Sequence, residues 1–117
     1  MDKKELEERT KQFALRIIKL VSVLPRGKVC DVIGYQLVKS GTSVGANYRE
    51  AGRAESKADF IHKIGIVEKE AGETQYWLEL LIDEGIVQKD KLSGLWDECG
   101  QLLAIFTATG RSAKKRK

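Results

Sequence analysis

Four glycines recur on one face of a long amphipathic segment. Gly34, Gly41, Gly45 and Gly52 are spaced 7, 4 and 7 residues apart, and an α-helix turns by about 100° per residue, so they fall on one narrow stripe. Inside a helix, glycine costs about 1 kcal/mol relative to alanine. Four glycines on one face therefore predict a helix whose backbone lies very close to another backbone, and we expect self-association to follow from that contact.

Residues 41–45 also have the composition of a phosphate-binding loop. Such a loop needs a strand before the glycines, a helix after them and a Gly-Lys-Ser/Thr triplet at its end. Here the glycines keep helical phase on both sides, and no such triplet follows. Beside the glycines runs a second, apolar stripe, made of Val29, Ile33, Leu37, Val44, Tyr48 and Ala51. The segment is therefore predicted to be one amphipathic helix with an edge of small residues.

The apolar periodicity predicts four helices and an all-α fold. The first covers about residues 4–24 and ends at Pro25, and the second covers about residues 29–54. Ser56 and Asp59 have the spacing of a capping box that opens the third helix, which Gly85 ends. The fourth begins near Asp90, the expected N-cap. Short connections between long helices favour an antiparallel up-and-down four-helix bundle.

The charge composition of the last seven residues differs from that of the segment before them. A chain of 117 residues that is 42% hydrophobic forms one core, which we assign to residues 1–110. Residues 57–110 carry 5 Lys/Arg against 10 Asp/Glu, whereas residues 111–117 carry five cations and no acid. We expect this basic tail to be disordered. Two interpretations of it stay open: a solvated end, or a segment that grips phosphates.

The sequence predicts a cytoplasmic protein with free thiols. Its longest apolar run is a few residues, so we expect neither a membrane span nor a signal peptide. Cys30 and Cys99 lie far apart, which matches neither a zinc site nor a disulfide-rich secreted scaffold.

Apolar residues also occupy the side of the third helix that should face water. These are Ile66, Tyr76, Trp77 and Leu80. Such a patch is typical of a subunit contact, and together with Gly41 and Gly45 it predicts a homo-oligomer interface. The alternative is that Tyr76 and Trp77 lean over the edge of their own bundle.

No catalytic constellation can be assembled from the sequence. Asp59 and His62 have the i, i+3 spacing of carboxylate-bridged di-iron bundles, but those sites need a second such pair and there is no second histidine. We expect His62 to be a surface residue, and the two cysteines lack a histidine that would activate a thiolate. The sequence therefore predicts no catalytic residue, no metal site and no cofactor.

One stretch of sequence carries a family resemblance. Residues 42–51 read Thr-Ser-Val-Gly-Ala-Asn-Tyr-Arg-Glu-Ala, and Arg53, residues 60–64, Glu68 and residues 76–81 follow. This pattern resembles the bacterial four-helix-bundle family encoded by intervening sequences within large-subunit ribosomal RNA genes. The resemblance covers almost the whole chain and implies a homopentamer. The family is also similar to the accessory variability proteins of diversity-generating retroelements, which are basic pentamers that associate with a reverse transcriptase and nucleic acid.

Two functions from different classes follow. The first is a non-enzymatic oligomer that binds RNA or DNA, as an accessory to a reverse transcriptase, through basic residues of the second helix and the tail: Lys39, Arg49, Arg53, Arg111, Lys114, Lys115, Arg116 and Lys117. For Arg49 and Arg53, an ion pair or a solvated position is the alternative. The second function is a scaffold that docks a protein on the acidic surface of the third helix. Asn47, at the edge of the apolar stripe, is expected to form hydrogen bonds between helices.

Overall fold

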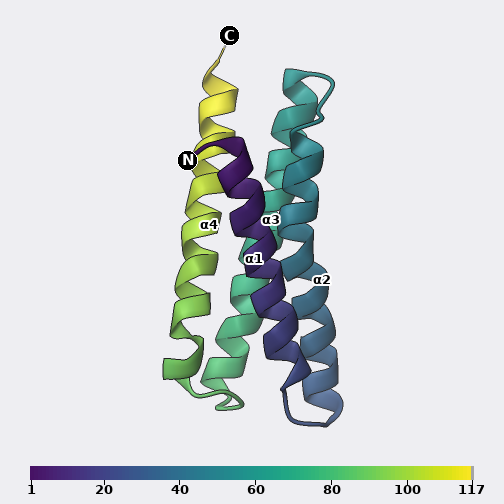
Figure 1. Cartoon of the computed structure of the whole chain (residues 1–117), viewed down its shortest axis with the longest axis vertical. Helices are drawn as coiled ribbons and strands as arrows, with labels where there is room; N and C mark the ends of the chain where they lie inside the picture. The colour runs from purple at the N-terminus through teal and green to yellow at the C-terminus, as the bar shows by residue number, and fades with distance from the viewer. Residues whose placement is uncertain (117) are drawn as a thin grey trace.

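The chain folds into four helices arranged as one elongated bundle (Figure 1). The computed structural model describes residues 1–116, so the prediction for Lys117 lies outside the described residues. Within residues 1–116 there is no strand, and the helices are α1 (Lys3–Ser22), α2 (Lys28–Ala51), α3 (Lys57–Asp83) and α4 (Lys89–Lys115). The bundle measures 49 × 22 × 20 Å. The predicted all-α four-helix fold is confirmed.

Successive helices run in opposite directions. Each packs against its neighbours in the chain, and α4 closes the ring against α1, so α1 lies diagonally opposite α3. The α1–α2 and α3–α4 connections lie at one end of the bundle (Figure 1). Both chain termini lie toward the other end, which also carries the α2–α3 connection; we call this the terminal end.

The predicted signals at the two ends of α3 are confirmed. The Oγ of Ser56 accepts a hydrogen bond from the backbone N–H of Asp59 at 3.0 Å. At the other end Gly85 has a φ of 73°, and the N–H of Ile86 donates to the carbonyl of Leu81. This is the glycine-terminated arrangement that satisfies the last carbonyls of a helix. The N-cap prediction for α4 was wrong, because Asp90 lies inside the first turn.

The close approach predicted by the glycines occurs within the chain, between α2 and α1. A Cβ added at Gly41 would lie 2.9 Å from Cγ1 of Ile17, and one at Gly45 would lie 3.0 Å from Oγ1 of Thr10. Both distances are tighter than ordinary van der Waals contact, so only glycine fits there without movement of α1. Gly34 faces Val21 of α1 in the same way.

The sequence predicted that the bundle ends at residue 110 and that a disordered tail follows, but α4 extends past this boundary. The helix continues to Lys115, so most of the basic tail is helical. Ala113, in the last turns of the helix, is buried, seven residues after the buried Phe106. The apolar register of α4 therefore extends into the basic segment. Lys114 and Lys115 also oppose the negative end of the helix dipole, which favours this extension.

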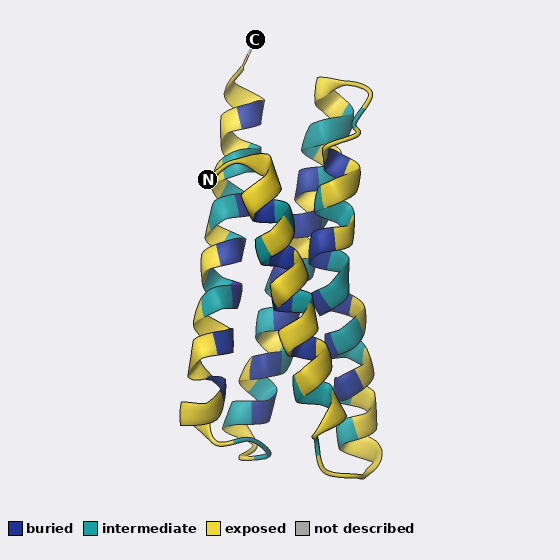
Figure 2. Ribbon diagram, in the orientation of Figure 1, coloured by how far each residue is buried: buried dark blue, intermediate teal, exposed yellow. Residues whose placement is uncertain are grey.

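The core is a single stripe of apolar side chains that follows the inner side of all four helices (Figure 2). Its largest fully buried members include Phe13, Ile17 and Phe106. Phe106 packs against Tyr48 with ring centroids 5.3 Å apart. α1 and α4 also meet at the surface, where Nε and Nη2 of Arg9 donate to the carboxylate of Glu98 at 2.7 and 2.6 Å.

Cys99 belongs to this core and is expected to resist alkylation in the folded protein. Burial raises the pKa of its thiol to about 12, and its Sγ donates to the carbonyl of Ala71 at 3.2 Å. The reactive thiolate is therefore depleted by roughly 10³ relative to an exposed cysteine. Mass spectrometry after iodoacetamide treatment should find Cys99 modified only when denaturant is present. Modification of Cys99 at one rate with and without denaturant would contradict this prediction.

Candidate nucleic-acid interface

The cations at the end of α4 lie on one helical face. Arg111, Lys114 and Lys115 are three and four residues apart, which places them side by side on a helix. They and Arg116 are exposed, and none forms an ion pair within the described part of the chain. Among residues 1–116, therefore, no carboxylate forms an ion pair with the cations at the C-terminal end of α4.

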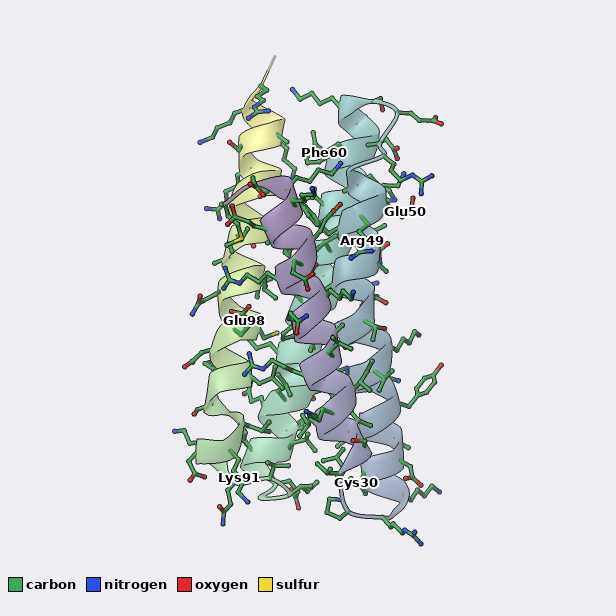
Figure 3. All side chains as sticks on the ribbon, viewed as in Figure 1. Cys30, Arg49, Glu50, Phe60, Lys91 and Glu98 are labelled. Carbon is green, nitrogen blue, oxygen red and sulfur yellow. The ribbon has the colours of Figure 1, made fainter. Side chains whose placement is uncertain are left out.

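The three predicted cations of α2 have three different surroundings. All are exposed. Arg53 lies just after the end of α2, and its Nη1 is 3.9 Å from the carboxylate of Glu50, so the ion-pair alternative applies to Arg53. Lys39 faces α3, where it acts on Glu70. Arg49 forms no ion pair within residues 1–116 and lies beside α1 (Figure 3). α2 therefore does not present its cations as one basic surface.

Lys39 lies near a carboxylate of α3, that of Glu70. The pKa of Glu70 is raised, first because the carboxyl group is partly desolvated and next because Glu73 lies nearby, while Lys39 partly opposes the shift. The carboxylate of Glu70 offsets part of the positive charge of Lys39 and repels another anion. A phosphate would meet the same repulsion, so of the predicted cations Lys39 is the least suited to contact nucleic acid.

A hollow between α1 and α2 brings Arg49 together with a cation that the sequence did not single out. Its volume is about 340 Å³, and it is lined by Thr10, Lys11, Ala14, Thr42, Gly45, Ala46 and Arg49. Lys11 could not be found from sequence, because its proximity to Arg49 depends on which face of α1 packs against the glycines of α2. No carboxylate lines this hollow.

The predicted interface residues of α2 are already covered within one chain. Gly41 and Gly45 are buried against Ile17 and Thr10 of α1. The stripe thus has an intramolecular partner, and a second subunit is not needed to explain it. Asn47 likewise differs from expectation: its Nδ2 donates to the carbonyl of Ser43 on its own helix at 2.8 Å.

The four predicted interface residues of α3, which we call the α3 face, are exposed to different degrees. Tyr76 is 53% exposed, whereas Ile66, Trp77 and Leu80 are half-buried. Trp77 packs against the core of its own bundle, as the alternative interpretation proposed, and its ring meets that of Tyr76 edge-on. The Nε1 of Trp77 is buried and has no acceptor among the described residues.

A second apolar surface, which the sequence analysis missed, lies on α1 and α2. Leu15 and Ile18 are 47% and 45% exposed on α1, and Val32 and Tyr35 are 54% and 66% exposed on α2. We call these four residues the α1–α2 face. The α1–α2 face and the α3 face thus come from different helices.

The structure places His62 at the surface, as the sequence analysis expected. Asp59 bonds to Lys63 at 2.9 Å. That hydrogen bond is the largest reason why the pKa of Asp59 is lowered. The described residues contain no group of three or more side chains placed to hold a metal ion. None of their helices is long and apolar enough to cross a membrane.

Comparison with known proteins places this fold in a family. A family model described as "23S rRNA-intervening sequence protein" matches residues 3–108. The chain belongs to this family. The match spans all of α1, α2 and α3 and most of α4, and it bears out the resemblance carried by residues 42–51.

A solved structure agrees with this family assignment. It is the crystal structure of a protein with unknown function from the S23 ribosomal protein family of Bacteroides thetaiotaomicron. The two chains are 35% identical and superpose with a TM-score of 0.86. The superposition covers 95% of this chain and 99% of the Bacteroides chain. A comparison with curated proteins found no match.

Proposed function

We propose that this family member is a non-enzymatic, self-associating protein that binds RNA or DNA through the C-terminal turn of α4. The observation that carries the proposal is the set of Arg111, Lys114, Lys115 and the C-cap Arg116 at the end of α4, which form no ion pair with any residue that the structure describes. Clustered cations without carboxylate partners release counterions when they meet phosphates. An ordered helix also loses less conformational entropy on binding than a disordered tail would.

Self-association would multiply this cationic surface. The α1–α2 face leaves four large apolar side chains exposed and the α3 face leaves Tyr76 exposed, as subunit contacts do. A ring such as the pentamer implied by the resemblance needs two different faces on each subunit.

Several copies would bind a nucleic acid more tightly than one copy, because contacts made by a second subunit become intramolecular. The resemblance to retroelement accessory proteins extends this proposal to a partner enzyme, a reverse transcriptase, for which the assembly would hold the nucleic acid. Catalysis would then belong to that enzyme, and the bundle itself would supply no reacting group.

The test is a salt series of fluorescence anisotropy with duplex DNA, single-stranded DNA and structured RNA. Neutralising three cations in one variant, Arg111→Gln, Lys114→Gln and Lys115→Gln, keeps good helix formers in place. We expect the slope of log affinity against log salt to fall by about two to three, and the affinity to fall by at least roughly tenfold.

Lys89→Gln with Lys91→Gln is the matched control. These exposed lysines lie at the start of α4, at the opposite end of the bundle, and we expect their loss to leave affinity nearly unchanged. Equal affinities and equal salt slopes for the wild type and the triple variant would contradict the role of the α4 end.

One observation favours a different class of function, a protein scaffold. The pKa of Glu70 is raised first by partial desolvation and next by the nearby Glu73, and a basic partner protein would relieve the repulsion between these two carboxylates. Glu73, Glu79 and Asp83 are exposed on the same helix, and Glu84 is exposed at its C-cap. A protein partner whose capture survives nuclease treatment and is lost on Glu73→Gln would favour the scaffold.

A further inference from the structure

We propose that the hollow between α1 and α2 is a phosphate-binding site in which Lys11 and Arg49 hold the anion from two sides. The two cations come from different helices, and both line the same hollow of about 340 Å³. Both are exposed and neither forms an ion pair within residues 1–116. The site therefore combines a concave surface with two positive charges that nothing in the described chain neutralises.

The floor of the hollow exists because the helices approach so closely. Gly45 brings the backbone of α2 against Thr10 of α1, and the residues that flank this contact, Ala14, Thr42 and Ala46, are small. The side chains of these three residues are too small to fill the space between the two helices at the surface. The volume is near the lower end of the roughly 300–1,000 Å³ typical of small-molecule sites, so a phosphate group fits together with part of what it is attached to.

The hydrogen-bonding groups around the hollow select for an anion. The hydroxyl of Thr42 donates to the carbonyl of Val38, and that of Thr10 donates to backbone carbonyls of α1. The free donors are therefore those of Lys11 and Arg49. A guanidinium group can donate two parallel hydrogen bonds to one phosphate, and an ammonium adds a point charge.

The carboxylates closest in sequence are engaged or lie elsewhere. Glu50, next to Arg49, faces Arg53, and Glu8 accepts from Nε2 of Gln12. Glu7 is one turn before Lys11 on α1, but it does not line the hollow and forms no ion pair with Lys11. An anion entering the hollow thus meets cations and small residues before it meets a carboxylate.

The phosphate has two sources that share this chemistry: a phosphodiester of a nucleic-acid backbone, or free phosphate. The first of these rests on the proposed function, since it adds a second contact to the one at the end of α4. The second source is independent of nucleic-acid binding. One double variant, Lys11→Gln with Arg49→Gln, tests both. Lys19→Gln is its control, because Lys19 is an exposed lysine of α1 that lines a different hollow, next to α4.

The first arm titrates inorganic phosphate at constant ionic strength and follows backbone-amide NMR signals. We expect saturable shifts at Thr42, Gly45 and Ala46 in the wild type and in Lys19→Gln, and none in the double variant. The second arm measures anisotropy with the nucleic-acid probes. There we expect the double variant to lose roughly tenfold in affinity and to lower the salt slope by about two, with the triple variant of α4 measured beside it.

Each combination of results decides between the sources. Shifts with phosphate but unchanged nucleic-acid affinity assign the hollow to free phosphate, and weakened nucleic-acid binding assigns it to a phosphodiester. If the wild type binds no nucleic acid, the proposed function fails. The phosphate titration alone then decides whether the hollow binds phosphate. Absence of phosphate shifts, together with no loss of nucleic-acid affinity in the double variant, overturns the inference.

Discussion

Replacing Gly41 with leucine is expected to lower the free energy of unfolding by about 3 kcal/mol, the upper end of the usual cost of overpacking a core. A Cβ at this position would lie 2.9 Å from Cγ1 of Ile17, whose side chain is fully buried. Since Ile17 is held by the core on its other side, the added side chain must push α1 away from α2. Chemical denaturation at one fixed protein concentration measures the change.

Gly65→Ala is the matched control for this substitution. Gly65 lies in α3, and a Cβ added there would meet no atom within 4 Å. Its backbone is not in the positive-φ region, so alanine should raise the free energy of unfolding by up to about 1 kcal/mol. The two substitutions are thus expected to act in opposite directions. A Gly41→Leu protein as stable as the wild type would mean that the close contact between α1 and α2 is not needed.

The glycine pattern shows what a sequence can and cannot fix in a helical bundle. The spacing of Gly34, Gly41 and Gly45 determined which face of α2 must approach another backbone, because helical phase follows from residue number alone. It did not determine the partner. That partner is α1 of the same chain, and only the packing of the whole bundle decides between it and a second copy.

The end of α4 was misjudged for a different reason. Five cations in seven residues are typical of a disordered tail, and this composition obscured a periodic signal. Ala113 continues the buried stripe of Leu102 and Phe106 at helical spacing, so the helix could have been extended by following apolar register rather than charge. Neither apolar register nor charge could have singled out Lys11, since its position beside Arg49 depends on the contact between α1 and α2.

The proposed ring makes a further prediction about mass. Ile18→Glu together with Tyr35→Glu on the α1–α2 face should reduce the particle to the mass of one chain, and so should Tyr76→Glu on the α3 face. These side chains are exposed in a single chain, so glutamate should leave the fold intact. At a subunit contact, however, each charge would lose its hydration without gaining a partner. Light scattering measures the mass, and chemical denaturation checks that both variants remain folded.

Mixing the two variants separates a ring from a simple symmetric pair. In a head-to-tail contact the α1–α2 face of one copy meets the α3 face of the next, so each variant retains the one intact face that the other has lost. The mixture should therefore form particles of two chains, although each variant alone is a monomer. A symmetric contact of the α3 face with itself would instead allow the Ile18→Glu, Tyr35→Glu variant to pair on its own. Particles that keep the wild-type mass in both variants would reject the two faces as subunit contacts.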